Sequence, residues 1–115
     1  MKIMKDEKQA PDEAILNEEI DIEKYALEGK TPPHARSYRF KVNEVICTWD
    51  KPIILGREVL ERAGLTPPDQ YTLREKIKGG TPRRIELDEK VDLRKPGVEK
   101  FRAIRKGQTE GHEYE

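Results

Sequence analysis

The sequence predicts an α+β fold in which one helix packs across a mixed β-sheet. Residues 37–42 and 45–49 are alternating or β-branched segments separated by an Asn-Glu pair, which is typical of a β-hairpin. A short amphipathic segment at residues 57–63 predicts a helix, and strand-like segments follow it. This order predicts one compact domain over residues 36–105.

The hairpin is expected to have one buried face. Tyr38, Phe40 and Val42 alternate with polar residues, so their side chains are predicted to point to the same side of the strand. Asn43 suits the chain reversal because asparagine tolerates a positive φ. In the helix, the expected apolar face and stop signal are Val59, Leu60, Ala63 and Gly64.

Three further strands are expected after the helix. Residues 71–77 alternate and end in a turn signal at residues 78–82, which contains two glycines and a proline. Ile85 and Leu87 indicate at most a brief strand, and residues 98–104 predict the last one. This is the element order of the ubiquitin-like β-grasp fold, with a mixed sheet of four to five strands.

Residues 1–35 are predicted to be a flexible arm. They are rich in acidic residues and end near a Thr-Pro-Pro triplet that breaks helices. Within the arm, Ile20, Ile22 and Tyr25 are spaced so that a short strand or a helical turn forms when a partner surface covers them. We therefore expect a docking segment that orders on self-association or partner binding, with a solvated tail as the equally supported alternative. Residues 106–115 are predicted to be a mobile tail.

Composition excludes several classes of function. Lys plus Arg (23) equals Asp plus Glu (23), so no global field attracts nucleic acid or anionic lipid. The single cysteine, Cys47, excludes an internal disulfide and a cysteine-based zinc site, and it fits a reducing compartment. The start of the chain lacks a signal-peptide pattern, and no segment approaches the roughly 20 apolar residues of a membrane span. We expect a cytoplasmic protein with neither a membrane nor a nucleic-acid partner.

Neither catalysis by the chain itself nor a bound cofactor or metal is expected. Cys47 lies in a predicted strand without a neighbouring histidine, which favours a core or strand-surface position over a nucleophile. His34 and His112 lie in the two regions predicted to be flexible, so they provide no preformed metal site.

Several segments together resemble bacterial multiubiquitin-domain proteins. The similar segments are residues 21–30, 52–60, 63–64, 91–93, 96–101 and 108–111. Members of that family are usually encoded beside activating-enzyme-like, conjugating-enzyme-like and metalloprotease-like proteins. The resemblance therefore implies a protein modifier whose C-terminal carboxyl group is adenylated and transferred to targets by such partners.

Two features depart from the family pattern. Many members have Thr where this chain has Leu55, so the predicted helix lacks a hydroxyl N-cap. Many members also carry two or more ubiquitin-like repeats, whereas residues 1–35 cannot hold a second one.

Two glycines near the end of the sequence are candidate processing and conjugation points. A modifier threads its end into narrow enzyme sites, and glycine suits these because it lacks a Cβ. Gly111 matches the family tail and leaves residues 112–115 as a removable extension, whereas Gly107 lies nearer the last strand and is the alternative. A terminus in which neither glycine has a function is the open alternative to both.

The sheet face turned away from the helix is the predicted partner surface. Its outward residues are Arg39, Lys41, Thr72, Arg74, Lys76 and Arg102, a largely cationic set. Such a face would contact acidic enzyme surfaces or the acidic arm of another copy. The basic run at residues 76–84 is interpreted as a solvated turn.

The acidic arm suggests a second function. Residues 17–22 in an extended form could add to a sheet edge of a neighbouring copy, which would give a head-to-tail homo-oligomer. The alternative to a modifier is therefore a non-conjugated β-grasp binding module that assembles into filaments through its N-terminal arm.

Overall fold

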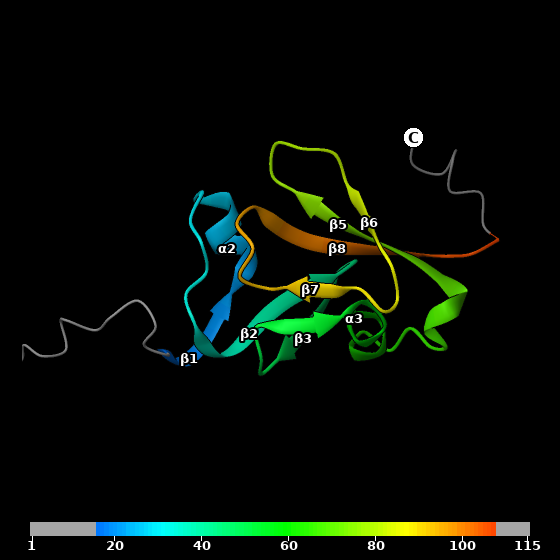
Figure 1. Ribbon diagram of the computed structural model, residues 1–115, viewed down its shortest axis with the longest axis horizontal. Coiled ribbons are helices and arrows are strands. Elements are labelled where there is room, and N and C mark those ends of the chain that lie inside the picture. The colour runs from blue at the N-terminus through cyan, green and yellow to red at the C-terminus, as the bar shows by residue number, and fades with distance from the viewer. Residues whose placement is uncertain (1–15, 108–115) are drawn as a thin grey trace, which may run out of the picture.

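The computed structural model describes residues 16–107, which form a mixed six-stranded sheet with two α-helices (Figure 1). The strands of this sheet are β1 (Leu16–Asp21), β2 (Ala35–Val42), β3 (Val45–Trp49), β5 (Tyr71–Ile77), β6 (Arg83–Ile85) and β8 (Val98–Arg105). A separate antiparallel pair consists of β4 (Ile53–Leu55) and β7 (Lys90–Asp92). The helices are α2 (Ile22–Leu27) and α3 (Gly56–Arg62), and a 3-10 turn, η1, spans Pro68–Gln70.

The strand order confirms the predicted β-grasp. The sheet runs β1-β2-β8-β5-β6, and β3 pairs with the opposite side of β2. β2 and β8 are parallel, while β3 and β5 run antiparallel to these two strands. The path β3-β2-β8-β5-β6 holds every strand of the predicted sheet, so β1 and α2 are additions to the expected arrangement.

The predicted hairpin and helix are confirmed. β2 and β3 pair outward from Val42 and Val45 around Asn43, whose φ is 58°. All three predicted inward residues of β2 are buried, and α3 buries Val59 and Leu60 against them. Burial of one such large apolar side chain contributes about 1.5–3 kcal/mol. The hairpin, α3 and the inner faces of β5 and β8 therefore share one core.

The missing hydroxyl cap of α3 is replaced by tertiary contacts. Leu55 has no side-chain acceptor, but its own N–H donates to the Glu58 carboxylate at 2.9 Å. The N–H groups of Gly56 and Arg57 donate to main-chain carbonyls of the loop before β7, at 3.0 and 2.9 Å. A Cβ at Gly56 would collide with the Glu86 carbonyl, so this close approach requires glycine.

The segment between β5 and β8 differs from the prediction. Ile85 ends β6, which begins at Arg83, so the short strand lies earlier than expected. Residues 90–92 form β7, a strand that the local sequence pattern did not predict, and β7 pairs with β4. Three-residue strands are too short for a two-residue period to be recognised in the sequence. Pairing with a distant strand therefore decides where such strands form.

Two strands, β1 and β8, pair with the same hydrogen-bonding edge of β2. β8 pairs with β2 only at Phe101, which lies opposite Val42. β1 covers the first half of the same side in parallel, with Ile20 opposite Tyr38. Because two strands divide one hydrogen-bonding edge, the N-terminal segment completes the sheet that β8 leaves open.

The pairing of β1 with β2 corrects the prediction that the N-terminal arm is flexible, for residues 16–35. Residues 16–35 do not remain apart from the domain, because Ile20 is 4% exposed and Ile22 is fully buried in the core. Asp21 caps α2 by accepting from the Glu23 N–H at 3.1 Å. The open half of β2 supplies the covering surface that the sequence had suggested would come from a partner. Residues 1–15 lie outside the described part of the chain.

Asn43 continues the ladder where β2 ends. Its side-chain amide donates to the Ala103 carbonyl at 3.1 Å, and its side-chain oxygen accepts from the Ala103 N–H at 3.0 Å. Its own main-chain N–H donates to the Phe101 carbonyl at 2.8 Å. One side chain therefore acts as an extra strand residue that joins the hairpin turn to β8.

Replacing Asn43 tests this junction. Asn43→Gly retains access to the positive φ but loses both hydrogen bonds to Ala103, so we expect the free energy of unfolding to fall by about 1–3 kcal/mol. Glu44→Gly in the same turn is the matched control, since it makes the same change in chain entropy and otherwise removes only the solvent-exposed ion pair with Lys100, which contributes little. The measurement is urea denaturation. Equal losses in both variants would show that the amide contacts do not hold the turn to β8.

Candidate functional site

Three arginines lie in one row on the outward face of the sheet. Arg74 on β5 is directly opposite Arg84 on β6 and Arg102 on β8. Leu73, beside Arg74 in the sequence, is buried, so the arginines point away from the core. Residues directly opposite on one face have Cβ atoms about 4.5–5.5 Å apart. We call these three residues the arginine row.

The row brings three positively charged side chains together. Like charges directly opposite one another in a sheet are destabilising by about 0.2–1 kcal/mol. Arg84 forms an ion pair with Glu86 at 3.5 Å, but the two side chains are 55% and 66% exposed, so solvent weakens it. Arg102 is exposed. An acidic partner that covers the row would relieve this repulsion and would gain charge-assisted hydrogen bonds.

The positive charges of the neighbouring lysines are paired with glutamates of the same chain. Lys76 lies opposite Lys100, and it pairs with the largely buried Glu99 at 3.1 Å. Lys100 pairs with Glu44 at 3.8 Å. The predicted partner residue Lys76 therefore lies on the expected face, with its charge already partly satisfied.

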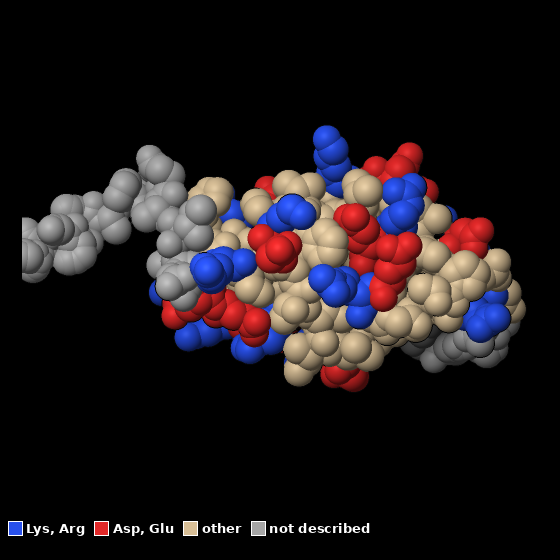
Figure 2. Space-filling model, turned by 90° about the horizontal axis from the view of Figure 1, so that it is seen from below, with Lys and Arg blue, Asp and Glu red and all other residues tan. Residues whose placement is uncertain are grey.

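Two more of the predicted partner residues are occupied within the chain. Arg39 pairs with Glu19 at 3.1 Å and with Asp21 at 3.4 Å, and Lys41 pairs with Glu23 at 3.4 Å. Acidic and basic residues alternate on the surface over this end of the molecule, at the left of Figure 2. The acidic segment that was expected to reach another copy thus neutralises the β2 side of its own sheet.

The predicted docking segment is likewise used within the chain. Ile20 and Ile22 belong to the core, and Tyr25 packs against it partly buried. These side chains therefore do not form a free apolar surface in this structure. Sequence spacing had identified a segment that needs a covering surface, but it could not show that β2 and β8 provide one.

The structure removes Thr72 from the predicted partner surface and adds Arg84 to it. Thr72 is only 9% exposed and lies opposite Ile104, so it offers little contact area. Arg84 was missed because the basic run was interpreted as a turn. Its position next to the inward Ile85 is the signal that places it outward once β6 is known to begin at Arg83.

An open cavity lies between the arginine row and the end of β8. Its volume is about 320 Å³, and its lining includes Arg57, Arg84 and Lys106 together with Glu86 and Asp88. Cations thus extend from the row toward the point where the chain leaves the sheet.

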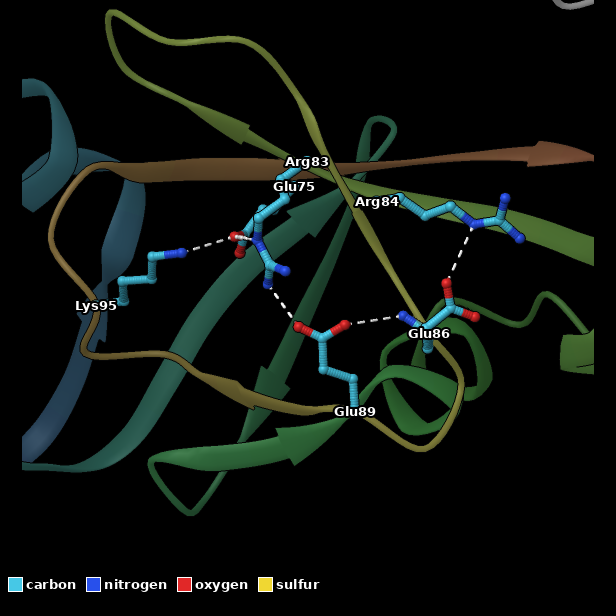
Figure 3. Close-up of polar contacts among 6 residues, drawn as sticks. All are labelled: Glu75, Arg83, Arg84, Glu86, Glu89 and Lys95. Carbon is cyan, nitrogen blue, oxygen red and sulfur yellow. Dashed lines mark hydrogen bonds and ion pairs between the residues drawn. The ribbon is translucent and has the colours of Figure 1, made fainter.

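A second cluster of charged residues lies around the buried Glu75 of β5, and Figure 3 shows its geometry. Glu75 is 1% exposed and accepts from Arg83 Nε at 2.8 Å and Lys95 Nζ at 2.9 Å. Arg83 also donates to Glu89 at 2.6 Å. Two carboxylates balance two cations, so this network ties β5, β6 and the loop before β8 together and leaves no net charge for a ligand.

The same network shifts two pKa values. The pKa of Glu89 is lowered, first by the hydrogen bond from the Glu86 N–H and then by Arg83. The pKa of Arg83 is raised, first by its hydrogen bond to Glu75. Both shifts favour the charged forms, so Arg83 and Glu89 stay ionised around neutral pH.

The positions of the cysteine and the histidine within the described residues indicate structural roles. Cys47 is 5% exposed, and burial raises the pKa of its thiol while Arg62 opposes that shift. A raised pKa lowers the thiolate fraction, which is the nucleophilic form. His34 Nε2 lies 2.8 Å from Arg94 Nη1 and accepts from it, because a guanidinium only donates. His112 lies outside the described residues.

Residues 16–107 contain no cluster of three or more His, Cys, Asp or Glu side chains that could hold a metal ion. Neither helix in this part of the chain has the length and apolar content needed to cross a bilayer.

The chain leaves the sheet from the end of β8. The Lys106 N–H still donates to the Gln70 carbonyl at 2.7 Å, so the ordered contacts extend one residue beyond the strand. Gly107 follows with φ of +90° and open space around it. Gly111, the favoured processing point, lies outside the described residues.

Reversing one charge in the arginine row tests whether it is repulsive. In Arg102→Glu the new carboxylate faces Arg74, so we expect the free energy of unfolding to rise by about 0.2–1 kcal/mol at low salt and by less at high salt. Arg105→Glu, which changes the same strand opposite Tyr71, is the control and should show no such gain. Urea denaturation at two salt concentrations measures both. A loss of stability in Arg102→Glu would contradict the repulsion within the row.

The comparisons with known proteins agree with the fold. The family model described as multiubiquitin matches residues 38–106, which extend from Tyr38, the fourth residue of β2, to the turn after β8. β1 and α2 lie before the matched region. The searches of the curated proteins and of the solved structures found no match. Because the family model covers more than half of the sequence and the strand order is that of a β-grasp, the chain belongs to the multiubiquitin family.

Proposed function

We propose that this chain is a ubiquitin-like protein modifier. A metalloprotease-like partner trims its C-terminal segment, an activating-enzyme-like partner adenylates the new carboxyl group, and a conjugating-enzyme-like partner helps to transfer it to a target. The chemistry resides in these partners, so the chain itself needs a presentable terminus and a recognition surface. The cytoplasm, where ATP is available and Cys47 stays reduced, fits such a pathway.

The observation that carries this proposal is the position from which the chain leaves the sheet. β8 lies between β2 and β5, and its pairing with β5 extends from Val98 to Arg105. Arg105, Lys106 and Gly107 are exposed. These three residues are therefore presented to solvent at the end of a strand that the sheet holds on both sides, as the attachment point of a processed terminus would have to be.

Reach favours Gly111 over Gly107 as the mature end. Gly107 is one residue beyond the last main-chain contact, at Lys106, so the folded domain would meet the rim of a narrow enzyme site. Gly111 lies four residues further along the sequence, which adds roughly 13–14 Å in an extended chain. Hydrolysis of the peptide bond after Gly111 would release residues 112–115.

The arginine row supplies the recognition surface in this proposal. One of its members, Arg102, lies on β8, the strand that leads to the terminus, and another, Arg84, lines the same cavity as Lys106. Complementary charge raises association rates and orients the encounter. An acidic surface on an activating or processing partner is therefore the expected counterpart.

Intact mass spectrometry tests the processing step. The full-length chain is co-expressed with the metalloprotease-like partner, and we expect loss of the mass of residues 112–115. Gly111→Glu should block this loss, because a side chain at the cleavage position prevents close approach of the backbone to the catalytic groups.

Gly107→Glu is the matched control and should still be processed after residue 111. Cleavage that Gly107→Glu blocks and Gly111→Glu does not would assign the mature end to Gly107. An unchanged mass in the presence of an active partner would contradict the modifier function and favour a binding module.

A second candidate, a self-assembling module, rests on the contact between β1 and β2. This contact adds a strand to β2 outside the matched family region, and the same contact between two copies would exchange the arm and form an open chain. In this alternative the module is not conjugated, and assembly is its function.

Locking the arm within one chain tests the exchange. Glu19 and Ser37 are Cα partners in the parallel ladder, so Glu19→Cys with Ser37→Cys can form a disulfide between β1 and β2 of one copy. If assembly needs exchange, large particles in sedimentation velocity should disappear in the oxidised monomeric form and return on reduction. Particles that persist in the locked form would exclude this route.

A further inference from the structure

Three strands of the sheet have a side without a strand partner among residues 16–107, namely β1, β3 and β6. Open edges attract other strands, and proteins usually protect them with charges, proline or short length. β1 carries Glu18, Glu19 and Asp21. β6 has only three residues and includes Arg83 and Arg84. Both of these edges are protected.

β3 is the exception. It has five residues, Val45 to Trp49, with neither charge nor proline among them, in a chain whose residues are 40% charged. In an antiparallel hairpin, alternate residues of the outer strand direct their main-chain N–H and C=O groups away from the partner strand. The edge therefore offers hydrogen-bonding groups without the usual obstacles.

Both faces of β3 also expose aliphatic side chains. Val45 lies opposite the buried Val42 and so belongs to the core side, yet it is 47% exposed. Ile46 lies opposite Lys41 on the outward side and is 62% exposed. The lower central surface in Figure 2, on the β3 side of the molecule, is mainly uncharged. Apolar surface thus accompanies the open edge on both sides.

The far end of the strand is held rigid. Trp49 Nε1 donates to the Ile53 carbonyl at 2.8 Å, and the Arg62 guanidinium and the Lys51 ammonium lie 5.1 and 5.7 Å from the ring centroid. The indole is therefore fixed in orientation on the core side of β3. A second strand beside β3 would find this ring already in place, so little side-chain entropy would be lost on docking.

We propose that β3 pairs with β3 of a second copy of this chain, antiparallel about a two-fold axis at Cys47, to make one continuous sheet. In this register Val45 of one copy lies opposite Trp49 of the other on the core side, and Ile46 lies opposite Thr48 on the outward side. Each exposed aliphatic side chain gains a neighbour, and the pattern is the same in both directions, as a closed two-fold interface requires.

Charge favours a second copy as the occupant. The formal net charge of the chain is zero, so two copies do not repel each other globally. The arginine row lies on β8, β5 and β6, at least two strands from β3. At about 4.8 Å per strand, the nearest arginines of the two rows would be roughly 24 Å apart, well beyond the screening length of about 8 Å.

This dimer is separate from the proposed modifier function. It leaves the arginine row and the end of β8 uncovered, because both lie away from β3. It also differs from arm exchange, since a two-fold contact closes at two copies, whereas a head-to-tail contact continues.

Sedimentation velocity of the full-length chain from low to high micromolar concentration tests the proposal. We expect a reversible monomer–dimer equilibrium, together with slower amide exchange in β3 at high concentration. Ile46→Lys places a charge on the edge at a solvent-exposed position, so it should raise the dimer dissociation constant by about tenfold or more while the monomer stays folded.

Leu27→Lys is the matched control, since Leu27 is 52% exposed on α2 and the dimer should be unchanged. A chain that stays monomeric throughout, or a dimer that Ile46→Lys leaves intact, would overturn the proposal. Larger assemblies that persist in Ile46→Lys and vanish in the Glu19→Cys, Ser37→Cys lock would also overturn it, in favour of arm exchange. Circular dichroism of each variant confirms folding.

Discussion

The division of one edge of β2 between β1 and β8 is the constraint on which the rest of the structure depends. β8 meets β2 at a single residue pair, and β1 covers the other half of the edge. Without β1, the main-chain groups of half a central strand would lack partners, and Ile20 and Ile22 would leave the core. Without the Asn43 side chain, the turn would be joined to β8 only by main-chain contacts and by the exposed ion pair between Glu44 and Lys100.

The same division arranges the charges. Placing β1 beside β2 brings Glu19 and Asp21 next to Arg39, so the acidic segment neutralises that end of the outward face. Farther along, Glu75 is enclosed with Arg83 and Lys95 on the inner side. What remains outward on β5, β6 and β8 is the arginine row. A chain with zero net charge therefore has a basic surface beside the end of β8.

Much of the β-grasp was predictable from local patterns, whereas much of the candidate site was not. Alternation identified the inward side of β2, and helical spacing identified Val59 and Leu60 in α3. The outward direction of Arg74 and Arg102 followed from the same alternation. Arg84 was missed because its strand is three residues long, and Thr72 was wrongly included because burial depends on neighbours such as Ile104. The partners of Arg39 lie 18 to 20 positions away in sequence, so no local pattern shows them.

The sequence by itself determined the hairpin, the helix and the longer strands of the β-grasp and their order, because hydrophobic periods of two and 3.6 residues are local properties that act within each segment. It also determined the inward and outward residues of the longer strands. Only the tertiary structure decided which edges are covered, which charges are neutralised and which strand remains open. These outcomes depend on contacts between distant segments, such as β1 on β2 and Asn43 on Ala103, whose energies exist only once the chain has folded.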